Sequence, residues 1–288
     1  AALEGQFVAV AVGIKGRVHG EHGRDTFDLH GRNWKYNLLR KAARPFVHEY
    51  IAVSKDLAGW LVSSIGAGRT PVNQIYNGVD PVKFRPRRGS RPAVLPSGFA
   101  DDASVLFGSV GRMAAVKDYP TLVRAFIHLV RESDEARQRA RLVLVGEGAA
   151  RAQCQKLLDE ANLAALAWLP GERHDIADCL QALDVFVLPS LNEGISNTLL
   201  EAQACGLPVV ATRVGGNVEL VCEDLTGVLF EPANSLNLAQ VLRSYLDDPV
   251  RRQREGAAAR AGIESAHSLD AMAGAYQAVY DRVLVENN

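Results

Sequence analysis

The feature that most constrains the fold is an alternation of short apolar runs with amphipathic stretches. The apolar runs lie at residues 105–110, 141–145, 166–169, 185–188, 208–211 and 227–230. Helical stretches separate them, at residues 119–131, 149–161, 175–182, 197–205 and 235–246. Strands that are apolar throughout and alternate with amphipathic helices are typical of a parallel sheet covered on both faces. The sequence therefore predicts an α/β fold with a doubly wound parallel sheet, whose ligands bind at the carboxyl ends of the strands.

The first part of the chain has the same alternation in a shorter form. Strand-like runs at 17–20, 50–53 and 73–76 alternate with helical stretches at 34–43 and 55–63. Residues 84–97 are rich in proline, glycine and charge without periodicity, which indicates a linker. We expect two Rossmann-like domains, 1–86 and 87–268, and a tail helix at 269–288. Since the chain opens inside a helix-like stretch, we expect the first domain to be truncated.

Charge and cysteine content exclude several classes of protein. The formal net charge is −1 over 288 residues, so no general basic field would attract nucleic acid, and phosphate binding would have to be local. The four cysteines lack the spacing of a zinc site and indicate reduced thiols in a cytoplasmic protein. The longest apolar run, residues 7–14, is far shorter than the ~20 residues that cross a bilayer.

The strongest site signal is a polar loop that leads into a helix after the run at 185–188. Ser196, Asn197 and Thr198 are all good N-cap residues, and Glu201 is spaced for a capping box with Thr198. A helix N-terminus binds anions through its free amides. Glu193 and Glu201 make sense beside it if they accept hydrogen bonds from ligand hydroxyls. The alternative is a capped surface helix with two solvated acids.

The second signal follows the run at 105–110. After the turn at Gly111, Arg112 and Lys117 lie in a loop before the next helix. Arginine offers a fork of donors and lysine a mobile charge, which together suit a diphosphate. Two ordinary surface cations are the alternative, but the sheet's ligand-binding edge favours a functional role.

Two weaker motifs complete the set. Gly146 and Gly148 follow a strand, but the third glycine of a dinucleotide fingerprint is absent, so we reject a nicotinamide site and expect a tight turn near the ligand. His19 and His22 flank Glu21 without a third zinc ligand or a helix. We expect one functional histidine here and no metal; His19 is also readily explained as an ordinary hydrogen-bonded residue.

In this order the motifs resemble the retaining glycosyltransferases of family 4, which have the two-domain GT-B fold. The matching positions are Asn77-Gly78-Val79-Asp80 with Phe84 and Pro86, Gly111-Arg112 with Lys117-Asp118, Pro189-Ser190, Glu193 with seven residues before Glu201-Ala202, Gly206-Leu207-Pro208-Val209, and Gly215-Gly216 with Glu219. The segment from His19 to Asp28 resembles a subgroup associated with exopolysaccharide and PEP-CTERM gene clusters.

The resemblance implies roles at matching positions. Arg112 and Lys117 would bind the donor diphosphate, Glu201 the ribose, and Glu193 the transferred sugar. His22 matches the histidine near the sugar's reacting carbon. The remaining donor-binding positions are Gly111, Gly146, Gly148, Arg173 near the base, Gly194, Ile195, Ser196 and Asn197.

The resemblance also implies an activity. It is the transfer of a sugar from a nucleoside-diphosphate sugar to a hydroxyl with retention of configuration, in exopolysaccharide or other glycan synthesis. Residues 1–86 would be the acceptor side, 87–268 the donor side, and 269–288 a helix crossing back to the first domain. No cofactor, metal or nucleic acid is implied; a glycan or lipid-linked acceptor is, the latter with contact at the inner face of the membrane. The alternatives are a non-catalytic or inactive-fragment nucleotide-sugar binder, and an epimerase or phosphorylase on the same fold.

Overall fold

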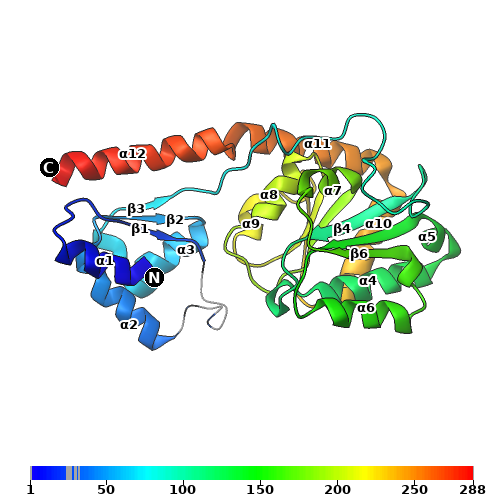
Figure 1. The fold of residues 1–288 in the computed structure, drawn as a ribbon, viewed down its shortest axis with the longest axis horizontal. Coiled ribbons are helices and arrows are strands. Elements are labelled where there is room, and N and C mark those ends of the chain that lie inside the picture. Colours follow the sequence, from blue (N-terminus) through cyan, green and yellow to red (C-terminus); the bar gives the residue numbers. More distant parts are fainter. Residues whose placement is uncertain (1, 24–27, 29–30, 32, 288) are drawn as a thin grey trace. The chain divides into compact units, whose positions relative to one another are not determined.

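The computed structural model describes residues 2–23, 28, 31 and 33–287. The chain divides into two compact units (Figure 1). The small unit comprises Ala1–Gly78, Glu193–Ile195 and His267–Asn288, and the large unit comprises Val79–Asn192 and Ser196–Ala266. Each unit is described by itself below.

The large unit is built on a six-stranded sheet in which all neighbouring strands are parallel. The strands are β4 Val105–Val110, β5 Ala140–Val145, β6 Ala167–Gly171, β7 Val185–Leu188, β8 Val209–Thr212 and β9 Gly227–Phe230. Their order in the sheet is β6-β5-β4-β7-β8-β9. The chain therefore proceeds from β4 toward one edge and returns through β7 toward the other. This confirms the predicted doubly wound sheet and places the topological switch point between β4 and β7.

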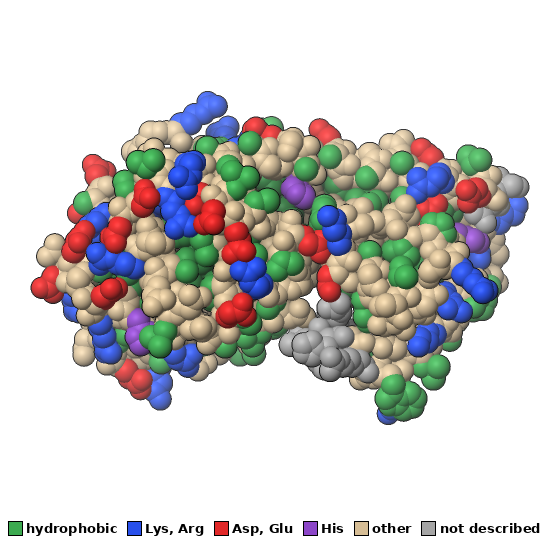
Figure 2. Space-filling model, turned by 180° about the vertical axis from the view of Figure 1, so that it is seen from behind, with side chains coloured by type: hydrophobic (Ala, Val, Ile, Leu, Met, Phe, Trp, Pro, Cys, Tyr) green, Lys and Arg blue, Asp and Glu red, His purple; other side chains and the backbone are tan. Residues whose placement is uncertain are grey.

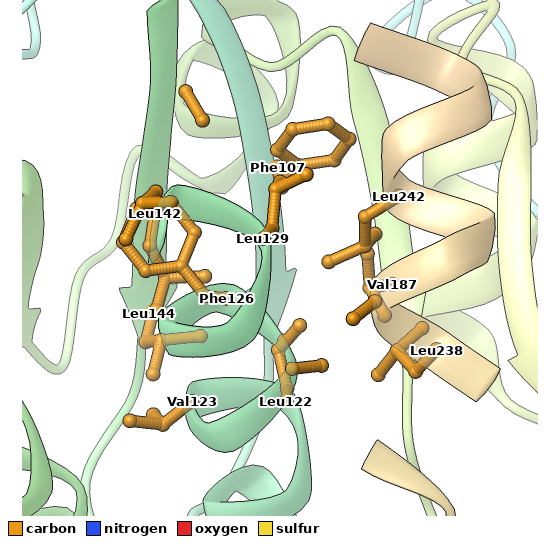
Figure 3. Close-up of a cluster of buried hydrophobic side chains, with 14 of the residues drawn as sticks. Phe107, Leu122, Val123, Phe126, Leu129, Leu142, Leu144, Val187, Leu238 and Leu242 are labelled. Carbon is orange, nitrogen blue, oxygen red and sulfur yellow. The ribbon is translucent and has the colours of Figure 1, made fainter. Parts of the chain in front are cut away.

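Helices cover both faces of this sheet (Figure 1). On one face lie α4 Tyr119–Glu132, α6 Arg151–Glu160 and α10 Ser235–Asp247, which share one buried cluster with the strands (Figure 3). Leu122, Phe126 and Leu129 of α4 recur at helical spacing and are fully buried there. Burying each such side chain contributes about 1.5–3 kcal/mol. The other helices are α5 Asp134–Arg139, α7 Ile176–Ala182, α8 Asn197–Ala204, α9 Asn217–Leu220 and α11 Pro249–Ala266, of which α8 packs against α7 and α11.

The segment predicted as a linker is part of the large unit. The Nη2 atoms of Arg87 and Arg91 lie 2.9 Å and 2.8 Å from the two carboxylate oxygens of Asp184. Phe84 is buried, and its carbonyl accepts a hydrogen bond from Arg260. The chain passes from one unit to the other at Gly78–Val79, before the predicted boundary at residue 86. The ion pairs join residues far apart in sequence, so local composition did not reveal them.

The small unit holds a three-stranded parallel sheet in the order β1-β2-β3. Its strands are β1 Val18–Glu21, β2 Glu49–Ala52 and β3 Val72–Gln74, and its α-helices are α1 Ala2–Ala11, α2 Trp34–Ala43, α3 Lys55–Trp60 and α12 Leu269–Asn287. A π-helical turn, Leu61–Ile65, continues α3.

Helix α12 packs on this small sheet although it is the last element of the chain. Val279 lies in one buried cluster with Ile51 and Ile75. Arg282 Nη2 lies 2.9 Å from Glu49 Oε2, a carboxylate that is almost fully buried. The tail helix is therefore a structural element of the small unit. Among the described helices, none is both long and apolar enough to cross a membrane.

Candidate functional site

The loop after β4 carries the two predicted diphosphate-binding cations. Gly111 donates its amide to Val145 O at 2.9 Å, which ties the start of the loop to the end of β5. Arg112 is exposed, and its guanidinium has no hydrogen bond or ion pair within the described residues. Lys117 ends a 3-10 turn, Ala115–Lys117, directly before α4. The loop therefore holds one exposed and one half-buried cation at the carboxyl end of β4.

The loop before α8 lies against the Lys117 loop. Leu191 donates its amide to Val116 O at 2.8 Å. Both loops follow strands at the switch point of the sheet, so the residue beside Lys117 is joined to the segment that leads into α8. The two loops predicted to bind phosphate are the loop after β4 and the loop before α8. The structure brings the first into contact with the part of the second that belongs to the large unit.

Ser196 is the N-cap of α8, and its Oγ accepts the amide of Leu199 at 3.4 Å. Thr198 is already inside the helix, so the capping box predicted between Thr198 and Glu201 does not form. Glu201 lies on the second turn of α8 instead. This leaves its carboxylate available for another partner.

A cavity of about 420 Å³ lies at the carboxyl ends of β4, β5 and β6. Its lining residues are Val110, Gly111, Arg112, Val145, Gly146, Glu147, Glu172, Arg173 and Ile176. The cavity combines an apolar wall with two cations and two acids. Such a mixture suits a planar apolar group that also carries polar atoms, as a nucleotide base does. Glu147 and Glu172 had no role in the sequence prediction, although both follow strands on the ligand-binding edge.

Arg173 is held in the wall of this cavity by its own neighbours. Its Nε donates to Asp175 Oδ1 at 2.7 Å, and Nη2 also bonds to Asp175. The guanidinium lies over the ring of Trp168, 5.6 Å from the centroid. The hydrogen bond from Arg173 holds the pKa of Asp175 below its usual value. Arg173 therefore offers a fixed surface to a ligand rather than a mobile charge.

The two glycines after β5 set the spacing of the loops. A Cβ at Gly146 would lie 2.0 Å from Gly111 O, and one at Gly148 would lie 2.6 Å from Met113 O. Both residues also have φ in the left-handed region, at 139° and 147°. The loops after β4 and β5 therefore touch backbone to backbone. Gly146 lines the cavity, and Gly148 is not among its lining residues.

The pKa of Glu201, in the large unit, suggests a functional role. Burial raises its pKa to about 7, against the opposing positive charge of Lys83. Burial thus favours the protonated form of this carboxyl more than water would. Hydrogen-bond donors from a ligand would stabilise the ionised form.

The remaining predicted site residues belong to the small unit. Glu193, Gly194 and Ile195 group with it although the residues on either side group with the large unit. A Cβ at Gly194 would lie 2.9 Å from His22 O and 3.4 Å from Gly23 Cα. Ile195 packs on the buried cluster that contains Leu57. The structure therefore brings the Gly194 segment against His22, whose side chain is exposed.

His19 is a structural residue. It is buried, and its Nε2 lies 3.5 Å from Glu21 Oε2. Burial alone would raise the pKa of Glu21, but His19 and Arg40 outweigh it and lower that pKa. Residues 24–27 of this motif, Asp25 among them, lie outside the described residues. Among the residues that are described, no group of three His, Cys, Asp or Glu side chains could hold a metal ion.

Two parallel α/β units with the polar loops at the carboxyl ends of the large sheet define the GT-B class of fold. Solved structures agree with this. Sucrose-phosphate synthase from Thermosynechococcus elongatus has a TM-score of 0.82 at 22% identity, over 99% of this chain and 72% of that one. Anabaena HepE in complex with UDP has a TM-score of 0.78 at 19% identity, over 99% and 76% of the two chains.

The chain belongs to the family described as glycosyl transferases group 1, which matches residues 94–262. Similar relatives include D-inositol 3-phosphate glycosyltransferases. That of Kineococcus radiotolerans is 36% identical over 69% of this chain and 49% of its own length. That of Thermobifida fusca is 31% identical over 79% and 54%. The chain spans about half the length of these relatives.

Proposed function

We propose that the protein is a glycosyltransferase that moves a sugar from a nucleoside-diphosphate sugar to a hydroxyl acceptor, with retention of the anomeric configuration. The observation that carries this proposal is the polar edge of the large sheet. The cavity lined by Arg112 lies at the carboxyl ends of neighbouring strands of this sheet. At the same edge, a hydrogen bond from Leu191 to Val116 joins two loops.

In this proposal the large unit holds the nucleotide. The base occupies the cavity beside Arg173, and Glu201 accepts hydrogen bonds from the ribose hydroxyls. Arg112, Lys117 and the amides at Ser196 and Asn197 bind the diphosphate. The raised pKa of Glu201 supports its assignment, because a ligand that donates hydrogen bonds to this buried carboxyl would stabilise its ionised form.

The small unit contributes His22 and the segment Glu193–Ile195 to the transferred sugar. The Glu193 carboxylate accepts from sugar hydroxyls, and the amides of Gly194 and Ile195 donate to the sugar or its phosphate. The close packing of Gly194 on His22 supports a shared role, since one would be displaced if the other moved.

The reaction breaks the bond between the anomeric carbon and the diphosphate oxygen and forms one from that carbon to the acceptor oxygen. The electron pair of the broken bond stays on the diphosphate, where the cations and helix amides stabilise it. The acceptor proton passes to the leaving phosphate on the same face of the sugar, which gives retention. Each charged hydrogen bond contributes about 1.5–3 kcal/mol, so loss of one slows transfer about ten- to a hundredfold.

We further propose that the protein belongs to family 4 and acts in glycan synthesis, including exopolysaccharide, on the motifs given in the sequence analysis. Structures of Anabaena HepE contain UDP and, in another case, UDP-glucose, which makes a uridine nucleotide sugar the first donor to test. The acceptor is a glycan or a lipid-linked glycan, and the latter would bring the protein to the inner face of the membrane from the cytoplasm.

A donor screen tests the proposal. UDP-, GDP- and ADP-sugars are compared by the thermal shift each produces, and the best is titrated by calorimetry into the protein and into Arg112→Ala and Lys117→Ala. We expect one base to dominate and each variant to bind about ten- to a hundredfold more weakly. Lys156→Ala is the matched control, since Lys156 is exposed on α6 and pairs with Glu160. Equal binding by all four proteins would reject the assigned site.

Two other activities are separated by product analysis with the selected donor. Free sugar epimer or sugar phosphate formed without acceptor would favour an epimerase or phosphorylase. Binding without turnover with any acceptor would favour a nucleotide-sugar binder.

A further inference from the structure

A second cavity, of about 210 Å³, lies at the opposite end of the large sheet's strands from the candidate site. Asp184 lines it directly before β7, and Pro208 lines it directly before β8. Its wall therefore stands at the amino ends of these strands, whereas the loops proposed to bind the nucleotide sugar follow the carboxyl ends. We call it the amino-end cavity.

Asp184 is the one acid among the residues that line the amino-end cavity, and its carboxylate is already bound on both oxygens. Oδ1 accepts from Arg87 Nη2 at 2.9 Å, and Oδ2 accepts from Arg91 Nη2 at 2.8 Å. Oδ2 also accepts the amide of Leu106 at 2.8 Å. Two guanidinium groups thus share one carboxylate, which has little capacity left for a third cation.

Arg252 is the second cation in the lining. Its Nη1 donates to the carbonyl oxygens of Tyr245 and Leu246. Its Nε and Nη2 make no hydrogen bond or ion pair with any residue that the structure describes. The residue is half-buried, and a charge withdrawn from water without a partner is unfavourable. These unpaired donors are therefore suited to an anionic ligand.

The positive charge at this cavity is local. Acidic and basic side chains intermingle over the face of the large unit that Figure 2 shows. The charged groups in and around the cavity are three arginines and two aspartates, Arg87, Arg91, Arg252, Asp184 and Asp248. Arg139 lies nearby but is paired with Glu135. Burial lowers the pKa of Arg252, and Asp184 and Asp248 only partly oppose this.

We propose that the amino-end cavity binds a small soluble phosphate monoester. A guanidinium offers its donors in a fork that matches phosphate oxygens, and the exposed amide of Gln253 lies in the same lining. Leu207 and Pro249 provide apolar contacts for a short carbon body. The cavity has half the volume of the one beside Arg173 and falls below the roughly 300 Å³ at which pockets for drug-sized ligands begin. The ligand is therefore small.

Calorimetry on the full chain tests the proposal. The probes are glycerol 3-phosphate, inorganic phosphate, uncharged glycerol, and glycerophosphoglycerol, which carries a phosphate diester as a lipid headgroup does. Arg252→Gln removes the unpaired donors, and Gln253→Glu adds a negative charge to the lining. Gln240→Glu is the matched control, since it makes the same charge change at an exposed position of α10 outside the cavity. Arg112→Ala reports binding of a probe at the candidate donor site instead.

Circular dichroism checks the folding of every variant. Arg252→Gln also loses the hydrogen bonds to two carbonyl groups and is the variant at risk of unfolding. Gln253 is exposed and makes no hydrogen bond with the residues described, so Gln253→Glu keeps the test decisive in that case.

We expect glycerol 3-phosphate and inorganic phosphate to bind and glycerol not to bind. Arg252→Gln should weaken binding about ten- to a hundredfold, and Gln253→Glu at least about fivefold. Gln240→Glu and Arg112→Ala should bind both phosphates like the original chain. The diester has one negative charge where the monoester has nearly two, so it should bind more weakly.

The proposal would be overturned by absence of phosphate binding, by binding that Arg112→Ala abolishes, or by equal affinities in Gln253→Glu and Gln240→Glu. A diester that binds as tightly as the monoester would also overturn it and indicate a lipid headgroup as the ligand. The binding of donor is measured at a different cavity, so failure here leaves the sugar-transfer proposal intact.

Discussion

The two units of the molecule bury their apolar side chains to very different extents. Every residue of β4, β7 and β8 in the large unit is buried. The small unit has two modest buried clusters. Of twenty exposed large hydrophobic side chains among the described residues, fourteen lie in the small unit, ten before Gly78 and four on α12.

This difference in burial corresponds to different proposed roles for the two units. The large sheet is covered on both faces, so its loops are displayed on a scaffold that is complete within the unit. The small unit has a three-stranded sheet, and large apolar side chains of its helices are exposed to solvent. In the proposed function, the large unit holds the nucleotide and the small unit positions the transferred sugar.

The largest expected effect tests the self-sufficiency of the large core. Phe126→Ala should destabilise the large unit by about 3–5 kcal/mol, because a fully buried ring is lost from the cluster in Figure 3. Hydrogen exchange in urea, followed by mass spectrometry, reports each unit separately. Equal loss of protection in both units would show a single cooperative core and break the comparison.

The next effect tests whether nucleotide binding and positioning of the sugar belong to different units. Gly194→Ala places a methyl group 2.9 Å from His22 O, so the Glu193–Ile195 segment must shift. Misplacement of this size should lower turnover about ten- to a hundredfold, while affinity for the free nucleotide stays unchanged. Steady-state kinetics and calorimetry measure the two quantities. Gly274→Ala is the control, since nothing lies within 4 Å of the added Cβ. A parallel loss of nucleotide affinity would contradict the division.

The sequence predicted the large sheet well because its strands are apolar throughout and each lies within one local window. Helix α11 was missed because it lacks an apolar stripe. Its buried positions include Glu255 and Gly256, and a Cβ at Gly256 would lie 2.1 Å from Gly206 O. Close backbone packing, rather than hydrophobic periodicity, fixes this helix. The false linker at 84–97 has a similar cause, since Asp184 pairs with Arg87 and Arg91 only in three dimensions.

The candidate site was predicted less completely than the fold of the large unit. Arg112, Gly146 and Arg173 do share one cavity, as expected for residues that follow neighbouring strands. The acids Glu147 and Glu172 in the same wall were not assigned, because an acid in a loop has no distinctive pattern. No sequence pattern predicted the packing of Gly194 on His22. It depends on the grouping of residues 193–195 with the small unit, although the residues on either side belong to the large unit.

A smaller effect concerns pH. Because burial raises the pKa of Glu201 to about 7 from an ordinary 4.5, its contribution to stability is complete below pH 4.5 and is lost as the pH rises through 7. In the proposed site, ribose hydroxyls donate hydrogen bonds to this carboxyl and so favour its ionised form. Donor affinity should therefore rise about tenfold from pH 6 to pH 8, as the ionised fraction of a group with this pKa increases.

Calorimetry at pH 6, 7 and 8 with the selected nucleotide sugar measures this dependence. Glu201→Gln should bind more weakly and lose the slope. Because Glu201 lies in the large unit and His22 in the small unit, His22→Gln should retain the pH dependence of donor affinity. A slope that survives in Glu201→Gln would place the titrating group elsewhere.

The smallest effect sharpens the account of the small unit, which holds two tryptophans in opposite environments. Trp34 is 68% exposed, and its visible contact is Lys35 Nζ, 5.8 Å from the ring centroid. Trp60 is 7% exposed, and its indole N–H donates to Gly31 O at 3.3 Å. Trp34→Ala should change the stability of the unit by less than about 1 kcal/mol, whereas Trp60→Ala should cost about 3–5 kcal/mol. Urea unfolding in each case is followed by the remaining tryptophan signal and by circular dichroism. If Trp34→Ala were as costly as Trp60→Ala, Trp34 would contribute to the folded small unit as much as a buried side chain does, and its exposure would be no guide to its role.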